Sequence, residues 1–170
     1  GEIRQLGKQD DFLHFQRIEG LLTMDIKKIT IAGAGTMGYS MADIFAQNGY
    51  EVTLWNHRQP TLDKAKTKIS PAAAEKITFT TSLDAFRGRD LIVESIAENL
   101  DIKLDFYRQM SPLADPETII ATNTSGLSIN KLAEAVTGPE RFLGMHWFNP
   151  PTLIPLIEII KNAKTRPDVA

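Results

Sequence analysis

Short apolar runs alternate with apolar residues at helical spacing along most of the chain. The runs at 29–32 and 52–55 predict two strands, each ending close to glycine or polar residues. Between them, apolar residues recur every three or four positions, at Met37, Met41, Ile44 and Phe45. We expect the helix that carries them to end at Asn48-Gly49, because glycine accepts the backbone conformation that closes a helix. Residues 26–55 therefore predict a strand–helix–strand unit.

The same alternation continues to the end of the chain. A helical stretch over 61–69 is expected to end before Pro71, since the residue before a proline disfavours helix. Asn99 to Met110 predicts a third helix, and Ser128 is placed to cap a fourth one that runs to Ala135 before Gly138-Pro139. Further strands are expected at 77–80, 91–93, 119–121, 142–145 and 156–160. Strands that alternate with helices predict an α/β fold with a mainly parallel, doubly wound sheet.

The first 23 residues differ from this pattern. They are polar, with a short apolar cluster over 12–22 whose spacing would suit an amphipathic helix. Met24 then opens a segment that resembles a natural chain start. We therefore divide the chain into residues 1–23, either sequence appended upstream or a true extension that packs on a neighbour, and one domain over 24–170.

Composition narrows the class of protein. With 42% hydrophobic and 24% charged residues, 170 residues suffice for one globular domain with a hydrophobic core. A net charge of −2, with lysine and arginine scattered, gives no reason to expect nucleic acid or a membrane as a partner. The absence of cysteine excludes disulfides, thiolate catalysis and cysteine-ligated zinc. No secretory signal is visible, so a cytoplasmic location is the default expectation.

The loop after the first strand carries a glycine motif. Gly33-Ala34-Gly35-Thr36-Met37-Gly38 satisfies G-x-G-x-x-G, directly after a predicted strand and at the start of a predicted helix. In this context the motif indicates a dinucleotide-binding Rossmann unit: a tight turn at the first glycine, room for a pyrophosphate at the second, and close packing of helix on strand at the third. The unpaired N–H groups of the helix would face the phosphates. The alternative is a chance glycine turn.

The end of the second strand bears on which nicotinamide cofactor binds. An acidic residue is expected there to hold the adenine ribose, but the chain has Asn56, followed by His57 and Arg58. Asparagine still hydrogen-bonds a ribose hydroxyl, and it removes the repulsion that a carboxylate exerts on a 2′-phosphate. Arg58 could pair with such a phosphate or be a solvated loop cation. The cofactor is therefore NAD or NADP.

Later motifs resemble those of a known family. Ile92 to Asn99 reads Ile-Val-Glu-Ser-Ile-Ala-Glu-Asn, Ala121 to Ser125 reads Ala-Thr-Asn-Thr-Ser, and Met145 to Pro150 reads Met-His-Trp-Phe-Asn-Pro. In this order they resemble the L-3-hydroxyacyl-CoA dehydrogenases of fatty acid metabolism, which include the 3-hydroxybutyryl-CoA dehydrogenases. The resemblance runs from about Ile26 to Lys161 and rests chiefly on the second and third motifs.

The resemblance implies a set of roles. His146 matches the catalytic histidine that exchanges a proton with the 3-oxygen of the substrate, and Glu158 matches the glutamate that orients it. Ser125 and Asn149 match residues that hydrogen-bond near the substrate oxygen and the nicotinamide. Glu98 and Lys103 match positions that contact the cofactor. The substrate implied is a short- or medium-chain acyl-CoA.

The chemistry is reasonable without the family. Oxidation of a secondary alcohol requires loss of a hydride and of a proton, and histidine exchanges protons near neutral pH. A carboxylate on its other nitrogen would select the tautomer. Each residue also has an ordinary alternative: His146 as a core or turn histidine, Glu158 as an edge-strand side chain, and Ser125 as a turn hydroxyl. Glu98 and Lys103 could likewise be solvated charges at a helix start.

Asn56 replaces the acidic residue that is usual in the family, and the chain departs from the family in two further ways. The segment between Asn56 and the strand at 91–93 is shorter than the family's helical arm that helps to hold CoA. Three lysines there, at 64, 66 and 68, could contact an anion or form a solvated face. The family also continues beyond the equivalent of Ala170 into an all-helical domain that completes the pocket and the dimer, so we expect a homo-oligomer. Two alternatives stay open: a dehydrogenase of a free 3-hydroxy acid or sugar acid, and an inactive nucleotide-binding module.

Overall fold

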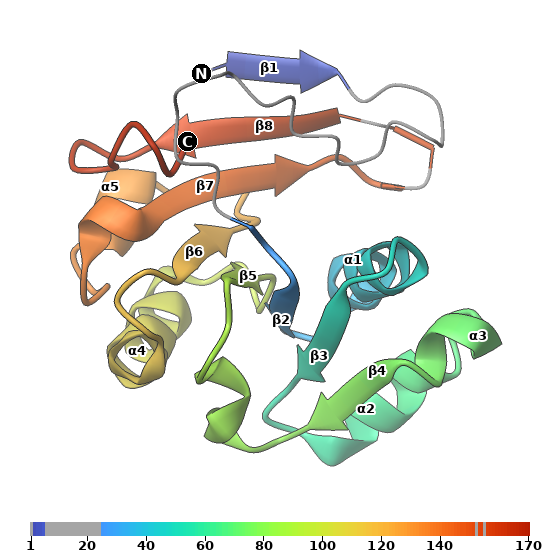
Figure 1. The fold of residues 1–170 in the computed structure, drawn as a ribbon. Helices are drawn as coiled ribbons and strands as arrows, with labels where there is room; N and C mark the ends of the chain where they lie inside the picture. Colours follow the sequence, from blue (N-terminus) through green and yellow to red (C-terminus); the bar gives the residue numbers. More distant parts are fainter. Residues whose placement is uncertain (1, 6–24, 152, 155) are drawn as a thin grey trace.

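A computed structural model describes residues 2–5, 25–151, 153–154 and 156–170. Within these ranges, eight strands form one sheet, and helices cover both of its faces (Figure 1). The strands are β1 (Glu2–Gln5), β2 (Lys28–Ala32), β3 (Glu51–Trp55), β4 (Ile77–Thr80), β5 (Leu91–Glu94), β6 (Ile119–Thr122), β7 (Phe142–Trp147) and β8 (Leu156–Lys161). The α-helices are α1 (Thr36–Gln47), α2 (Gln59–Lys66), α3 (Pro71–Ala74), α4 (Leu100–Met110) and α5 (Ile129–Ala133).

The strand order is β1-β8-β7-β6-β5-β2-β3-β4. Six neighbouring strands, in the order β7-β6-β5-β2-β3-β4, are parallel, and this order is that of the Rossmann fold. β8 pairs antiparallel with β7, and β1 pairs antiparallel with β8. The α/β fold with a mainly parallel, doubly wound sheet is therefore confirmed. In such a sheet, ligands bind beyond the carboxyl ends of the strands at the point where the order reverses, here between β2 and β5.

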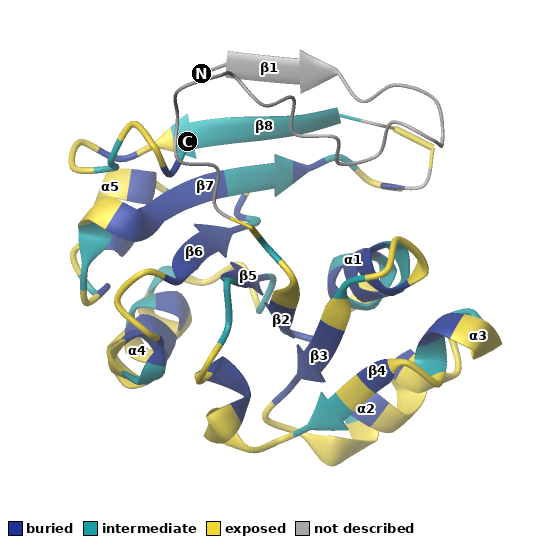
Figure 2. Ribbon diagram, in the orientation of Figure 1, coloured by how far each residue is buried: buried dark blue, intermediate teal, exposed yellow. Residues whose placement is uncertain are grey.

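Strand side chains alternate between two cores. Ile29 and Ile31 of β2 pack on the face covered by α1 and α2, together with Met41, Phe45 and Leu62. Ile92 and Ile120 pack on the opposite face, against Phe106, Tyr107 and Leu132 from α4 and α5. The central strands are thus buried on both faces (Figure 2), which explains why they read as continuous apolar runs.

The structure moves several predicted boundaries. The helix expected over 61–69 begins at Gln59, with Pro60 in its first turn, and ends at Lys66. Pro71 opens the separate short helix α3, since a proline ring suits the first turn of a helix. The helix expected to run from Ser128 to Ala135 ends at Ala133, although Ser128 is its N-cap as predicted. The strand expected over 142–145 extends through Trp147 and so includes His146.

The amino-terminal segment is described in part. Residues 2–5 form β1, whose register places Ile3 opposite Glu158. The apolar cluster over 12–22, with its expected helix, lies outside the described residues, and the division at residue 24 stays a prediction. No helix in the described parts of the chain is both long and apolar enough to cross a membrane.

Candidate active site

The glycine motif forms the turn from β2 into α1. Gly33 has a φ of +108°, a conformation that side chains rarely adopt, and a Cβ added there would lie 2.4 Å from the carbonyl oxygen of Ser95 after β5. A Cβ added at Gly38 would lie 1.8 Å from the carbonyl oxygen of Gly33. Both glycines are therefore required by close packing of backbone on backbone.

Gly35 has a different environment from its two neighbours. A Cβ added at Gly35 would meet no protein atom within 4 Å among the described residues, so this position faces open space at the start of α1. The first turn of α1, which the structure describes completely, contains no acidic side chain. Exposed backbone N–H groups and the positive end of the helix dipole suit an anion at this position. The start of α1 therefore fits a dinucleotide pyrophosphate beside the exposed Gly35 and Thr36, and contact of Gly33, Ala34 and Met37 with a cofactor stays a prediction.

Asn56 lies directly after β3, beside this turn. Its side chain is buried, its Oδ1 accepts a hydrogen bond from the backbone N–H of Ala34 at 3.4 Å, and its Nδ2 donates to the carbonyl oxygen of Arg58 at 3.3 Å. Arg58 is exposed and is the N-cap residue of α2. The structure therefore places a neutral amide at the position where an acidic residue was expected, with an exposed arginine two residues further on.

A cleft of about 320 Å³ lies next to the glycine turn. Its volume is at the lower end of the range for sites that bind small molecules. It is lined by residues at and after the ends of β5, β6 and β7, by Met37 of α1 and by Lys103 of α4; the strand-end residues are Ser95, Ile96, Glu98, Asn123, Ser125, His146, Trp147, Phe148 and Asn149. The cleft therefore brings together predicted residues that are up to about a hundred positions apart in the chain.

His146 and Glu158 face each other across β7 and β8. They are direct partners in the antiparallel register, and His146 Nδ1 lies 3.5 Å from Glu158 Oε2. The distance is that of an ion pair and is longer than a well-formed hydrogen bond of about 2.9 Å. The side chains are 21% and 36% exposed, so solvent still reaches both. The His146 ring also contacts Phe148, with ring centroids 4.7 Å apart.

Glu98 closes one wall of the cleft. Its Oε1 accepts hydrogen bonds from the Thr124 hydroxyl, from the backbone N–H of Ser125 at 3.1 Å and from that of Gly126 at 3.2 Å. Burial by itself would raise the pKa of Glu98, but these hydrogen bonds and the charge of Lys103 outweigh it, and the pKa is lowered from 4.5. Glu98 is therefore a carboxylate at neutral pH, and it holds the turn that carries Ser125.

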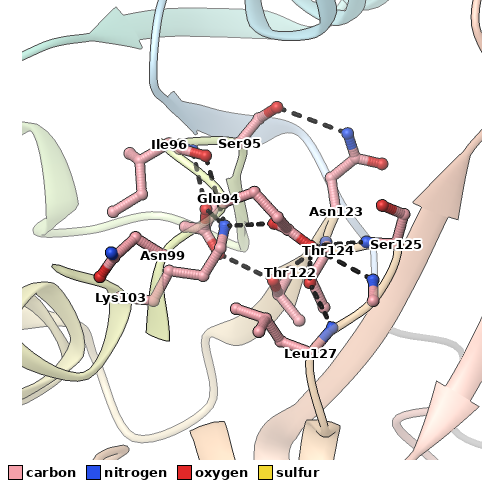
Figure 3. Close-up of polar contacts among 12 residues, drawn as sticks. Glu94, Ser95, Ile96, Asn99, Lys103, Thr122, Asn123, Thr124, Ser125 and Leu127 are labelled. Carbon is pink, nitrogen blue, oxygen red and sulfur yellow. Dashed lines mark hydrogen bonds and ion pairs between the residues drawn. The ribbon is translucent and has the colours of Figure 1, made fainter. Parts of the chain in front are cut away.

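Lys103 is placed differently from the other candidates. Its side chain is 1% exposed, and its ammonium contacts the carboxylate of Glu94 (Figure 3). The ammonium also lies 3.4 Å from Oε2 of Glu98. Contact between Lys103 and a cofactor, expected from the resemblance, stays a prediction. The structure places this ammonium between two carboxylates, and the buried lysine still lines the cleft.

Sequence reasoning missed two polar residues of this region. Glu94, the last residue of β5, was included in a motif without a role and is fully buried. Asn123, in the Asn-Thr-Ser motif, accepts a hydrogen bond at Oδ1 from the backbone N–H of Trp147 at 2.8 Å, and its Nδ2 donates to Ser95 Oγ at 3.4 Å (Figure 3). A polar residue at the carboxyl end of an otherwise apolar strand is the signal that both share.

Comparison with known proteins shows the family. The model of the 3-hydroxyacyl-CoA dehydrogenase NAD binding domain matches residues 28–170. The 5-formyl-3-hydroxy-2-methylpyridine 4-carboxylate 5-dehydrogenase of Mesorhizobium japonicum is 38% identical over 157 residues, covering 84% of this chain and 51% of that protein. The mitochondrial hydroxyacyl-coenzyme A dehydrogenase of Sus scrofa is 34% identical over 163 residues, covering 82% and 52%.

Solved structures agree with this result. A crystal structure of the pyridine carboxylate dehydrogenase, described as an NAD⁺-dependent dismutase, matches with a TM-score of 0.79 at 37% identity, covering 85% of this chain and 52% of that one. The chain thus spans about half the length of the curated relatives that it matches. With the family model matching 28–170 and a Rossmann fold in the structure, the chain belongs to the 3-hydroxyacyl-CoA dehydrogenase family of oxidoreductases.

Proposed function

We propose that this chain supplies the cofactor-binding and proton-transferring part of a dehydrogenase that interconverts the 3-hydroxy and 3-keto forms of a short- or medium-chain acyl-CoA. The observation that carries the proposal is the pairing of His146 with Glu158 at 3.5 Å, with His146 lining the cleft beside the glycine turn. A base, its carboxylate partner and a cofactor-binding turn are the parts that alcohol oxidation requires.

The proton-transfer part of the reaction is assigned to His146. In oxidation of the hydroxyl, the histidine would accept the hydroxyl proton, and in reduction of the ketone it would return that proton to the oxygen. Nδ1 faces Glu158, so Nε2 is the nitrogen available to a substrate. Glu158 would hold the ring in the tautomer with hydrogen on Nδ1 and stabilise the imidazolium once it forms. When bound, the nicotinamide supplies or accepts the hydride.

Orientation of the substrate is assigned to Ser125 and Asn149. Both side chains are exposed and line the same cleft as His146. A hydroxyl and an amide at these positions could donate hydrogen bonds to the substrate oxygen and so stabilise the charge that develops on it. The exposed position of Ser125 depends on the turn that Glu98 holds, which connects the glutamate to substrate orientation.

The test is an assay of NADH oxidation with acetoacetyl-CoA, in the wild type and in His146→Gln, with NADH affinity measured on the same samples. We expect the variant to lose activity by a factor of about 100 or more while keeping its NADH affinity. Wild-type turnover in the variant would contradict the role of His146. NADH binding with no turnover of any 3-keto substrate would instead identify the chain as an inactive nucleotide-binding module.

A non-CoA substrate is the second candidate. The relative that is 38% identical is named for a pyridine carboxylate, not for an acyl-CoA. The side chains of Lys64, Lys66 and Lys68, which could have contacted a CoA phosphate, are exposed, as on a solvated face. Comparing acetoacetyl-CoA with acetoacetate and with a pyridine aldehyde carboxylate in the same assay would separate the candidates: a preference for either free acid favours the second one.

The cofactor proposed is a nicotinamide dinucleotide, NAD or NADP. These two differ at the 2′-oxygen of the adenine ribose, which we expect to lie next to Asn56. The neutral amide of Asn56 exerts no charge repulsion on a 2′-phosphate, and Arg58 is exposed nearby in the chain. We therefore propose that the ribose site accepts NADP as well as NAD. The expected homo-oligomer stays a prediction.

A further inference from the structure

The carboxylate of Glu94 is fully buried at the carboxyl end of β5 and contacts four donors. Its Oε1 accepts hydrogen bonds from the backbone N–H of Ile96 at 2.7 Å and from the Lys103 ammonium. Its Oε2 accepts from the hydroxyls of Tyr107 and Thr122, each at 2.7 Å. Both oxygens are therefore fixed, so this carboxylate has no freedom to rotate away from Lys103.

Lys103 connects this interior carboxylate to the wall of the cleft. Its ammonium lies between Glu94 and Glu98, whose side chains are 0% and 44% exposed. The other oxygen of Glu98 accepts the three hydrogen bonds from the 124–126 turn, and Thr122 Oγ1 accepts one from the backbone N–H of Thr124 at 3.2 Å. A continuous set of contacts therefore runs from Glu94 through Lys103 to the turn that carries Ser125 (Figure 3).

Stability of the fold does not by itself account for this ion pair. Removing two charges from water costs several kcal/mol per ion, and well-packed apolar residues often stabilise a protein as much as a buried ion pair does. The pair lies at the end of β5, beside the point where the strand order reverses and ligands bind. Its position thus favours a role in the geometry of the cleft.

We propose that Glu94 is a positioning residue, which through Lys103 holds the Glu98 carboxylate against the 124–126 turn and so sets the cleft wall on which cofactor and substrate lie. The proposal rests on the proposed function in one respect, namely that the cleft binds a nicotinamide cofactor.

Three variants separate positioning from stability: Glu94→Gln, Lys103→Met, and the two combined. Each single variant leaves one buried charge without its closest partner and should be destabilised, whereas the double variant removes both charges and should regain most of the stability. We expect all three to bind NADH about tenfold more weakly than the wild type and to exchange the Ser125 and Gly126 amide hydrogens about tenfold faster. Calorimetry with NADH, urea unfolding and amide hydrogen exchange measure the three quantities.

A milder pair of variants covers the case in which the single ion-pair variants do not fold. Tyr107→Phe and Thr122→Val each remove one donor to Glu94 Oε2 and leave the ion pair intact. Thr122→Val also removes the acceptor of the Thr124 N–H, so Tyr107→Phe is the cleaner of the two. Burial and the neighbouring Glu94 carboxylate raise the pKa of Tyr107 well above its usual range, so its hydroxyl stays protonated and donates. Both variants should speed exchange at Ser125 and Gly126 in the same direction, by a smaller factor.

The matched control is Lys131→Met, which removes a lysine from an exposed ion pair with Glu134. It should change neither NADH affinity nor exchange at Ser125 and Gly126. Recovery of NADH affinity and amide protection together with stability in the Glu94→Gln, Lys103→Met double variant would overturn the proposal, because the pair would then be a structural element alone. A wild-type chain that binds no NADH would contradict the proposed function, while the exchange rates would still decide the role of Glu94.

Discussion

His146 and Glu158 are direct partners across an antiparallel pair of strands, with Nδ1 and Oε2 3.5 Å apart. The contact depends on β8, which pairs antiparallel with β7, whereas the strands from β4 across to β7 pair parallel. Side chains of directly opposed residues lie on the same face of a sheet, so the strand register by itself brings the imidazole and the carboxylate together. His146 and Glu158 are twelve residues apart in the chain, and the strand pairing makes them neighbours in space.

Replacing Glu158 with glutamine should reduce turnover without weakening cofactor binding. The amide keeps the shape of the side chain but does not stabilise an imidazolium, and it could hold the wrong tautomer, so we expect a loss of about 100-fold or more in kcat. Steady-state assays with acetoacetyl-CoA and NADH measure the loss, and Glu134→Gln, an exposed glutamate of another ion pair, is the control. An unchanged kcat would show that the pairing with His146 has no role in the reaction.

Gly38→Ala should destabilise the fold, whereas Gly35→Ala should weaken NADH binding. At Gly38 the new Cβ would meet the Gly33 carbonyl at 1.8 Å, so we expect a stability loss above about 2 kcal/mol. At Gly35 the Cβ would point into open space, so stability should change little while NADH affinity falls, because the methyl group takes the volume needed by the pyrophosphate. Thermal unfolding and NADH titration of the two variants give the comparison. Equal affinity in Gly35→Ala and the wild type would place the cofactor elsewhere.

Asn56→Asp should shift cofactor selectivity toward NAD. A carboxylate at this buried position would repel a 2′-phosphate and would accept hydrogen bonds from the ribose hydroxyls of NAD, so the ratio of NADH to NADPH affinity should rise about tenfold or more. Arg58→Ala should lower NADPH affinity without changing that for NADH. Titration of the wild type and both variants with each cofactor tests this. Identical ratios in all three proteins would remove Asn56 and Arg58 from the account of selectivity.

The lowered pKa of Glu98 predicts a pH-dependent contribution to stability. A carboxyl whose pKa is lower in the folded than in the unfolded chain stabilises the fold fully above its ordinary value of 4.5, and loses this effect as the pH falls through the lowered value. The difference in unfolding free energy between the wild type and Glu98→Gln should therefore be constant at pH 6–7 and shrink below about pH 4.5. Urea unfolding across this range measures it. A difference independent of pH would show that the Glu98 charge does not hold the 124–126 turn.

The local pattern of the sequence was sufficient for the glycine turn and for the order of elements from β2 onward, except the short helix α3. Apolar runs buried on two faces, a helical repeat between them and glycines at 33, 35 and 38 are all readable within about thirty residues. The boundaries near Pro71 and Ala133 were predicted less well, because buried residues continue at helical spacing beyond the ends of α2 and α5, at Ile69 and Val136. Tertiary contacts override weak local preferences at such positions.

Only the tertiary structure decided how the polar residues group. The sequence alone identified His146, Glu158, Ser125, Asn149 and Glu98 as candidates. The ends of β5, β6 and β7 bring four of them into one cleft, and the reversal of β8 sets Glu158 opposite His146. The tertiary structure also shows that Lys103 is buried and that the fully buried Glu94 is its ion-pair partner. A charged residue at a strand end reads the same whether it faces solvent or another charge, because pairing is a property of distance in space and not of position in the chain.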